Sequence, residues 1–297
     1  MTRIPNFPEF SSISLKQREE ISSFLREHPP LASEYSFTNL FAWRHSYKYR
    51  VSAFGNGFLF LKEKPVRAFL QPLVPENPLS AVKECFAFLG KGGKIERVGE
   101  DFLTSLGTIS DISAKPERNH FDYLYNSLEM RTLPGKRFHD KKNLVAQFEK
   151  KYSFQYTPLQ EKLIGECIAF KHSWCMERNC EDHEGLKQEH CAVLEMLRNF
   201  SALKGLRGGI LRVDGIIVGL TLGEELNKDT LVIHVEKANT RFSGIYQKIF
   251  KEFVQAEGEN YPFVNREQDL GIPGLRRAKQ SYNPVTMVKK YSLSLKE

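Results

Sequence analysis

Residues 210–236 read ILRVDGIIVGLTLGEELNKDTLVIHVE, and this stretch decides the fold. Apolar runs at 210–213 and 216–222 flank Asp214-Gly215, a dipeptide typical of the type I′ turn of a β-hairpin. A third apolar run at 231–236 follows a polar connection. The pattern predicts three strands that follow one another directly along the chain.

The other elements of this half are placed by working outward from those strands. Apolar residues recur at helical spacing over 244–256. Thr157 is expected to cap an earlier helix, with Gln160 closing a capping box. The remaining elements expected are a strand at 152–156, helices at about 157–174 and 188–200, a strand at Phe263, a helix from Pro273 and a strand at 285–293. The order β-α-α-β-β-β-α-β-α-β is that of the GNAT acyltransferase fold.

The first half of the chain repeats this order loosely. The elements expected there are helices at 14–27 and 35–44, a hairpin over 47–62, a strand at 69–73, a helix at 78–89, a strand at 94–98, a helix at 101–106 and a strand at 121–125. A basic helix at about 138–151 joins the halves. We therefore predict an α+β protein of two tandem GNAT-like domains, residues 1–151 and 152–297, with mixed sheets flanked by helices.

Composition limits the possible settings. The first ten residues lack the apolar core of a signal peptide, and the longest apolar stretch, at 209–223, is too short and too charged to span a bilayer. Five cysteines in 297 residues do not suggest a disulfide framework, so we expect a cytoplasmic protein. A net charge of +7 permits RNA, a nucleotide or an anionic lipid surface as partner.

Residues 265–284, NREQDLGIPGLRRAKQSYNP, concentrate chemically useful side chains after the expected strand at Phe263. Asp269-Leu270-Gly271 reads as a turn, Pro273 suits the first turn of a helix, and Asn283-Pro284 ends that helix. Carboxylates at a strand end, followed by cations on the next helix, could hold an amine and an anion close together. The alternative is a salt-bridged surface turn.

Four segments together resemble a known family. They are SEYSFTNLFAWR from Ser33, GKRFHDKKNLVAQF from Gly135, HVEKANTRFSGIYQ from His234, and the 265–284 segment. The chain is similar in them to the C-terminal catalytic domain of phosphatidylglycerol lysyltransferases, a family built of tandem GNAT-like halves. The resemblance implies transfer of lysine or alanine from a charged tRNA to phosphatidylglycerol in the membrane-bound members. This chain lacks their long multi-helix region, so we expect a different or unidentified acceptor.

The Gly135 segment is expected to bind an anion such as a tRNA phosphate, because cations and helical N–H groups gather at the start of a helix. The residues assigned to this site are Lys136, His139, Lys141, Lys142 and Asn143. A solvated basic helix start is the alternative.

Arg241 and Gly244 lie in a strand-to-helix loop that binds pyrophosphate in acetyl-CoA users of the fold. Tyr246 stands where a second small residue is expected, which disfavours coenzyme A and favours an aminoacyl-tRNA donor. A plain strand-to-helix turn is the alternative.

The catalytic assignments fall on the end of one strand and on the 265–284 segment. Glu236, Glu267 and Asp269 could bind an ammonium group, or one of them could act as general base. Lys279 or Arg277 could stabilise an oxyanion or hold a phosphate, and Tyr282 could donate a proton. Asn265 and Arg276 complete the substrate-binding set. A salt bridge from Glu236 to Lys237 or Arg241 is the alternative for that residue.

No metal site is assigned, although His172, Cys175, Cys180 and His183 are zinc-ligand types at loose spacing. The favoured function is aminoacyl transfer from aminoacyl-tRNA without a further cofactor. The alternatives are an acyl-CoA-dependent N-acyltransferase, for which acetyl-CoA is the co-substrate, and a non-catalytic module that binds a charged polymer. Peripheral contact with anionic lipid remains compatible with the charge.

Overall fold

The computed structural model describes residues 4–107 and 109–296, and the chain divides into two compact units. Unit 1 comprises Met1–Asp122, Gln268–Gly271 and Val288–Glu297, and unit 2 comprises Tyr123–Glu267 and Ile272–Met287. Each unit has a mixed sheet flanked by helices, as the order of elements predicts. The expected boundary at residue 151 differs from this division, because it lies inside unit 2.

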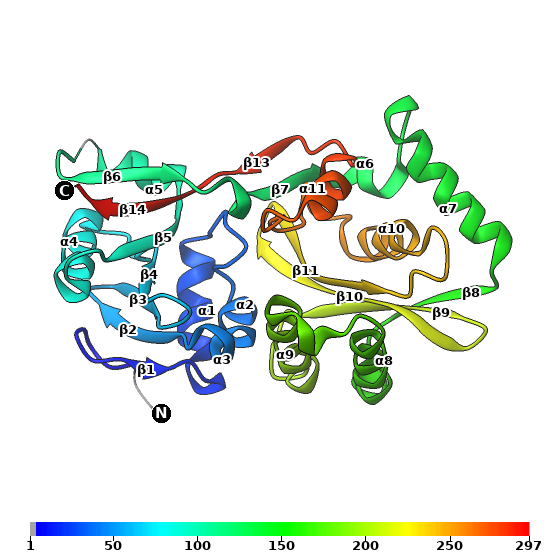
Figure 1. Ribbon diagram of the computed structural model, residues 1–297, viewed down its shortest axis with the longest axis horizontal. Helices are drawn as coiled ribbons and strands as arrows, with labels where there is room; N and C mark the ends of the chain where they lie inside the picture. The colour runs from blue at the N-terminus through cyan, green and yellow to red at the C-terminus, as the bar shows by residue number, and fades with distance from the viewer. Residues whose placement is uncertain (1–3, 108, 297) are drawn as a thin grey trace. The chain divides into compact units, whose positions relative to one another are not determined.

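The sheet of unit 1 has seven strands among the described residues. In spatial order they are β1 (Ser11–Ser12), β2 (Arg50–Phe54), β3 (Gly57–Lys62), β4 (Ala68–Leu70), β5 (Lys94–Gly99), β14 (Lys290–Leu295) and β6 (Ile112–Pro116). β4 and β5 are parallel, whereas β14 runs antiparallel to both of its neighbours. The last strand of the chain (red in Figure 1) therefore completes the interior of the first sheet.

The helices of unit 1 cover this sheet through apolar side chains. They are α1 (Arg18–Glu27), α2 (Phe37–Ala42), α3 (Arg44–Tyr47), α4 (Pro78–Leu89) and α5 (Glu100–Leu106), with 3₁₀ turns η1 (Leu15–Gln17) and η2 (Arg118–His120). Val82 and Phe86 of α4 pack in one buried cluster with Phe69 and Ile95 of the parallel strands. Burial of such side chains supplies most of the favourable free energy of folding.

A buried group of charges connects the start, middle and end of unit 1. The ammonium of Lys290, fully buried, pairs with Glu34 and, at 2.6 Å, with Asp122. Asp122 also accepts hydrogen bonds from Ser33 N at 2.8 Å and Ser33 Oγ at 3.0 Å. Burial by itself would raise the pKa of Glu34, but Lys290 and Arg97 lower it below its usual value. These ion pairs are what allow so many charges to be buried.

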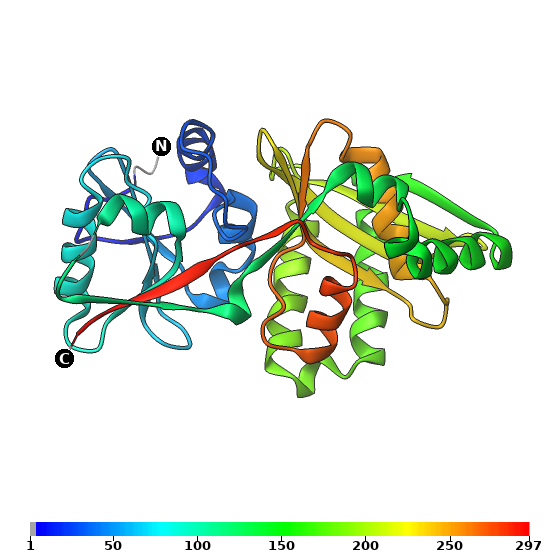
Figure 2. The ribbon, with the colours of Figure 1, turned by 90° about the horizontal axis from the view of Figure 1, so that it is seen from above.

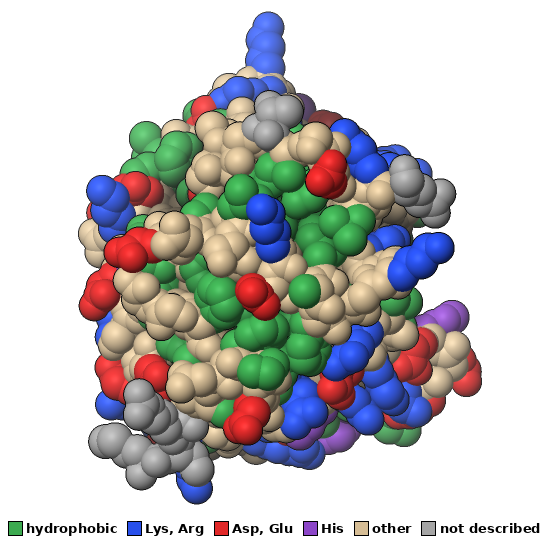
Figure 3. All heavy atoms as spheres, turned by 90° about the vertical axis from the view of Figure 1, so that its left-hand side faces the viewer, with side chains coloured by type: hydrophobic (Ala, Val, Ile, Leu, Met, Phe, Trp, Pro, Cys, Tyr) green, Lys and Arg blue, Asp and Glu red, His purple; other side chains and the backbone are tan. Residues whose placement is uncertain are grey.

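Figure 3 draws one face of the molecule, which carries side chains of both charge signs. Basic and acidic side chains are interspersed there around a centre rich in hydrophobic ones.

The sheet of unit 2 also has seven strands in the part of the chain that is described. In spatial order they are β13 (Thr286–Val288), β7 (Asp122–Asn126), β12 (Phe263–Asn265), β11 (Thr230–Ala238), β10 (Ile216–Asn227), β9 (Arg207–Val213) and β8 (Phe154–Pro158). β11 and β12 are parallel, and β8 to β11 form antiparallel neighbours. β7, which precedes residue 151, thus belongs to the second sheet.

Helices cover both faces of the second sheet (Figures 1 and 2). They are α6 (Ser127–Thr132), α7 (His139–Lys151), α8 (Ile164–Glu177), α9 (Glu184–Arg198), α10 (Ile245–Glu257) and α11 (Pro273–Gln280), with 3₁₀ turns η3 (Lys136–Phe138), η4 (Glu161–Leu163) and η5 (Cys180–Asp182). α10 lies on one face, and α8 and α9 lie on the other. Gly219 of β10 allows the close approach of α10, since a Cβ there would come within 2.8 Å of Ile249 Cδ1.

The local predictions are confirmed where turn chemistry is specific. Asp214 and Gly215 have φ angles of 50° and 81°, as a type I′ turn requires. The expected cap at Thr157 is wrong, because Thr157 and Pro158 extend β8 and α8 begins only at Ile164. In the described part of the chain, no helix has both the length and the hydrophobicity to cross a membrane.

Candidate active site in unit 2

The candidate site lies where β11 and β12 stop pairing. Their parallel ladder covers only three pairs, from Thr230–Phe263 to Val232–Asn265. β11 continues to Ala238, while the chain turns away after Asn265. Beyond Val232 and Asn265 the two strands no longer pair, and we call the region between them the opening. The side chains that lie in this region form the candidate site.

A β-bulge in β11 changes which side chains face this opening. Leu222 of β10 pairs with Val235, whereas Gly223 pairs with Ile233, so His234 is the extra residue. A bulge reverses the alternation of side chains along the strand beyond it. Glu236 consequently points to the face that carries α10, and Lys237 points to the face that carries α8 and α9.

Arg266 and Glu236 form an ion pair in which two guanidinium nitrogens donate to one carboxylate oxygen. Glu236 Oε2 accepts hydrogen bonds from Arg266 Nε at 3.0 Å and Nη2 at 2.6 Å, and both side chains are almost entirely buried. The guanidinium lies 4.0 Å from the ring centre of Phe250 and 4.8 Å from that of Tyr282. Burial would lower the pKa of Arg266, but Glu236 raises it, so the guanidinium remains charged.

Three polar atoms at this pair have unused hydrogen-bonding capacity. No described residue hydrogen-bonds Glu236 Oε1, Arg266 Nη1 or the hydroxyl of Thr221, although all three atoms are buried. Thr221 lies directly opposite Glu236 in the β10–β11 register. Buried polar groups without partners cost free energy, so such a group of donors and acceptors is suited to a polar ligand.

His234 forms a second charged group nearby with two carboxylates. Its Nε2 lies 3.0 Å from Glu224 Oε1 and its Nδ1 lies 2.8 Å from Glu267 Oε1. Burial would lower the pKa of His234, but the hydrogen bonds to the two carboxylates raise it to about 10. The imidazole is therefore protonated at neutral pH and donates from both nitrogens.

The turn after β12 holds Glu267 in an unusual backbone conformation. Its φ angle is 56°, in the left-handed region that non-glycine residues rarely adopt. Asn265 Oδ1 accepts a hydrogen bond from Glu267 N at 2.7 Å. The ammonium of Lys279 donates to the carbonyl oxygen of Arg266 and, at 3.1 Å, to that of Glu267. Strain of this kind persists only where several contacts fix it, and it is common at functional sites.

Tyr282 and Lys141 bring two sequence segments together. Tyr282 is buried, its ring packs edge-on against Tyr125 and Phe250, and burial raises the pKa of its phenol. Lys141 Nζ, on α7, lies 4.9 Å from the centre of the Tyr282 ring. Burial and then the charge of Arg266 lower the pKa of Lys141. The Gly135 segment and the 265–284 segment therefore meet beside the ion pair.

The other expected site residues lie in several places. Asp269 belongs to unit 1, where it is buried and pairs with Arg118 at 3.0 Å. Lys136 and Lys142 are exposed near the start of α7, and Asn143 contacts the His139 ring at 3.2 Å. Arg276 and Arg277 lie on α11.

The loop before α10 packs against α7 at its glycine. Gly244 has φ of 83°, and a Cβ there would come within 2.3 Å of the carbonyl oxygen of Leu144 on α7. Phe242 packs edge-on against Tyr152, at the end of α7. Close packing against α7 thus explains the glycine without a coenzyme A ligand, whereas Thr240, Arg241 and Ser243 of the same loop are exposed. Arg241 pairs at 3.3 Å with Glu177.

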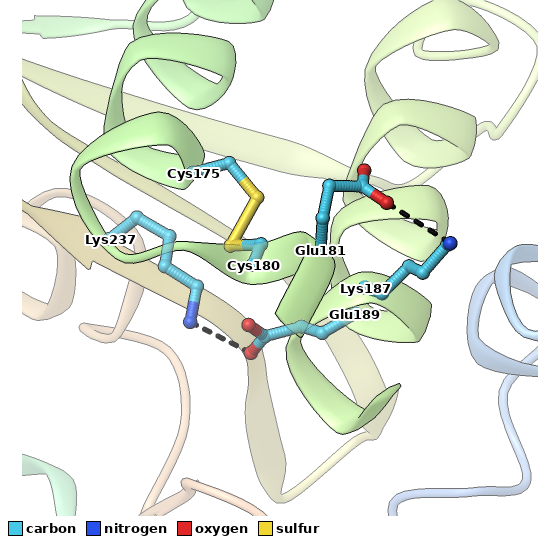
Figure 4. The surroundings of a disulfide bond; sticks show 6 residues. All are labelled: Cys175, Cys180, Glu181, Lys187, Glu189 and Lys237. Atoms are coloured by element: carbon cyan, nitrogen blue, oxygen red, sulfur yellow. Dashed lines mark hydrogen bonds and ion pairs between the residues drawn. A yellow bond between two sulfur atoms is a disulfide. The ribbon is translucent and has the colours of Figure 1, made fainter. Parts of the chain in front are cut away.

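A disulfide lies on the opposite face of the sheet (Figure 4). Cys175, at the end of α8, is bonded to Cys180 of η5, a pairing that the number of cysteines did not suggest. Two sulfurs bonded to each other offer no thiolate to zinc. Among the described residues, no three His, Cys, Asp or Glu side chains are arranged to hold a metal ion.

Lysines flank Trp174 on that face. Lys237 pairs with Glu189 at 2.7 Å (Figure 4) and lies 4.7 Å from the centre of the indole ring. Lys171 is fully buried, 4.6 Å from the same ring, and its ammonium has no hydrogen-bond partner in the described part of the chain. Burial, followed by the charge of Lys237, lowers the pKa of Lys171 to about 8.

Sequence reasoning missed four residues of this site: His234, Glu224, Arg266 and Thr221. One signal was available for His234, a titratable residue inside the apolar run of β11. Arg266 lies between two residues that were assigned, but a single arginine after a strand does not reveal its ion pair. The bulge and the pairing across strands are tertiary features without a local sequence pattern.

Comparisons with known proteins agree with this architecture. The family model for the C-terminal domain of phosphatidylglycerol lysyltransferase matches residues 26–294. The structure of a conserved protein of unknown function from Bacteroides thetaiotaomicron VPI-5482 is 33% identical, with a TM-score of 0.89, and the match covers 97% of this chain and 99% of that one.

More distant relatives are also similar. The C-terminal domain of a putative lysylphosphatidylglycerol synthetase from Agrobacterium fabrum is 13% identical, with a TM-score of 0.67 over 96% of this chain and 93% of that one. An uncharacterised protein of Mycoplasmoides gallisepticum is 24% identical over 180 residues, which are 57% of this chain and about half, 54%, of that relative.

The expected tandem GNAT-like α+β fold is thus confirmed, and the chain is related to transferases. Because the family match takes in residues 26–294 of 297, the chain belongs to the phosphatidylglycerol lysyltransferase C-terminal domain family.

Proposed function

We propose that the protein is an aminoacyl transferase that takes its aminoacyl group from aminoacyl-tRNA and passes it to an acceptor amine or hydroxyl. Membership of the family supports transfer of an aminoacyl group. The observation that carries the proposal for this chain is the Glu236–Arg266 pair, which is held rigidly while one carboxylate oxygen and one guanidinium nitrogen have no partner among the described residues.

The unused atoms match the chemistry of an aminoacyl ester. Glu236 Oε1 and the Thr221 hydroxyl can accept hydrogen bonds from an ammonium group, and Arg266 Nη1 can donate to a carbonyl or hydroxyl oxygen. Lys141, close to Tyr282, adds a positive charge on the side of α7, where the 3′ phosphates of a tRNA would be attracted. Together these groups would orient the ester for attack.

The reaction needs no cofactor in this proposal. The acceptor nitrogen or oxygen attacks the ester carbonyl and forms the new bond, and the bond to the ribose oxygen of the tRNA breaks. The proton lost by the acceptor ends on that ribose hydroxyl. Glu236 is engaged by a guanidinium and Glu267 by an imidazolium, so we assign both to binding and electrostatic stabilisation rather than to proton removal.

The test follows a radiolabelled amino acid from charged tRNA into other fractions. The protein is incubated with aminoacyl-tRNA and, in parallel, with phosphatidylglycerol vesicles, amine-bearing peptides or small amines as acceptors. Label leaving the tRNA for one of these fractions is the expected result and identifies the acceptor class. Failure to bind or discharge any aminoacyl-tRNA, at low as well as moderate salt, would refute the proposal.

A matched pair of variants tests the site. Glu236→Gln removes the charge that faces the ligand, and we expect the transfer rate to fall about 10- to 100-fold, the loss typical of a hydrogen bond to a charged group. Glu181→Gln, at a position whose side chain is 75% exposed, should keep the wild-type rate. Equal transfer rates for both variants would show that Glu236 does not take part in the reaction. Thermal unfolding of each variant shows whether a loss reflects chemistry or misfolding.

A further inference from the structure

His234 occupies a position in the sheet that regular pairing would not allow. It is the extra residue of the bulge in β11, between Val235, which pairs with Leu222, and Ile233, which pairs with Gly223. Its side chain is 1% exposed, yet both of its ring nitrogens face carboxylates. Bulges commonly redirect one side chain next to a functional site.

The imidazole ring connects three strands at the point where two of them separate. Glu224 comes from β10, His234 from β11 and Glu267 from the turn that follows β12. The last pair of the β11–β12 ladder, Val232–Asn265, lies two residues before His234 and Glu267. The ring thus bridges the strands just beyond their last pair.

The charges of this group are coupled. Glu224 and Glu267 are the titratable groups that raise the pKa of His234, to about 10, against the effect of burial. Glu267 is the most exposed of the three at 18%, so it is the member that a ligand can reach.

We propose that His234 is a positioning residue for Glu267: as a permanent imidazolium it fixes the carboxylate at the opening between β11 and β12, where the substrate ammonium binds. The proposal rests on the proposed function, because it adds Glu267 to Glu236 as a second carboxylate that binds the substrate amine. Two features support it. The left-handed backbone conformation of Glu267 restricts the directions in which its side chain can point. The contact with the His234 ring then fixes the position of the carboxylate.

Two substitutions of His234 distinguish a role of its charge from a role in packing alone. His234→Gln keeps a hydrogen-bond donor but removes the charge, whereas His234→Lys keeps a cation of similar reach. We expect the Gln variant to lose transfer rate about 10- to 100-fold. The Lys variant should recover part of that loss. The affinity for uncharged tRNA, which lacks the amine, should be unchanged in both.

A spectroscopic measurement tests the charge without any activity assay. In a nitrogen–proton NMR spectrum of the whole protein, both ring nitrogens of His234 should carry protons up to about pH 9, where an unperturbed histidine is neutral. Assignment comes from the spectrum of the Gln variant, which lacks these signals. This result stands or falls independently of aminoacyl-tRNA transfer, so failure of the proposed function and failure of the inference are distinguishable.

Three outcomes would overturn the inference. A neutral His234 ring at pH 7 would remove the imidazolium. A Gln variant with the wild-type transfer rate would show that Glu267 needs no such support. Equal losses in folded Gln and Lys variants would assign His234 to packing alone. If the Gln variant does not fold, Glu224→Gln provides the second route, because it leaves the His234–Glu267 contact in place and should retain more activity than the Lys variant.

Discussion

Replacing Gly244 by alanine tests whether α7 packs closely against the loop that binds coenzyme A in other proteins of this fold. Two costs follow from the structure. An L-residue at φ of 83° costs about 1–2 kcal/mol. The new Cβ would also lie 2.3 Å from the Leu144 carbonyl oxygen, and overpacking of this kind costs about 1–3 kcal/mol. Gly244→Ala should therefore lower the free energy of unfolding by about 2–5 kcal/mol.

Gly215→Ala is the matched control for the backbone cost. Gly215 has φ of 81°, and no atom lies within 4 Å of the place that an alanine methyl group would take, so only the cost of about 1–2 kcal/mol applies. Urea unfolding of the whole protein, followed by tryptophan fluorescence, measures both variants, and Trp174 is the tryptophan that lies in unit 2. Equal losses of unfolding free energy in the two variants would show that α7 does not pack closely against Gly244 in solution. The packing explanation of the glycine would then fail, and direct binding of acetyl-CoA should be measured.

Three further predictions follow from buried charges and from the disulfide. Lys290→Met should destabilise unit 1 by about 3–5 kcal/mol in urea unfolding, because it removes the ammonium partner of two buried carboxylates, whereas Lys289→Met, at an exposed position, should change little. Reduction of Cys175–Cys180 should release two thiols that mass spectrometry detects after alkylation, and should cost roughly 2 kcal/mol or less for so short a loop; alkylation of both without reductant would contradict the bond. The pKa of His234 in the folded protein is raised to about 10, so the charged ring contributes fully to the free energy of unfolding below about pH 6.5, and this contribution is lost as the pH rises towards 10. The free energy of unfolding of the wild type should therefore fall more over that range than that of His234→Gln.

The sequence predicts elements well where local chemistry determines them. Asp214-Gly215 fixes a hairpin through its turn angles, and Pro78 and Pro273 mark helix starts that the structure confirms. The prediction of a helix cap at Thr157 was wrong because a threonine followed by a proline can stand at the end of a strand as well as at the start of a helix. Pairing with β9 places Thr157 in the strand. β6 was missed, since its residues are half-buried or exposed and show no clear alternation.

The candidate site was predicted in part. Glu236, Glu267 and Tyr282 lie around the opening between β11 and β12, which sequence position beside the expected strands could suggest. Their partners depend on contacts between strands distant in sequence: the bulge directs His234, and the packing of Phe250 and Tyr282 holds Arg266. No single-sequence periodicity encodes such contacts.

The placement of β14 has a consequence for biosynthesis. Residues 290–295 fill an interior position of the first sheet, between β5 and β6, so that sheet cannot close until these late codons have been translated and the segment has left the ribosome. Unit 2 draws most of its sheet from the continuous stretch before residue 267, so its strands are available earlier. Unit 1 therefore completes its folding after unit 2, although it begins at the amino terminus. Its unpaired strand edges must be protected from aggregation during synthesis.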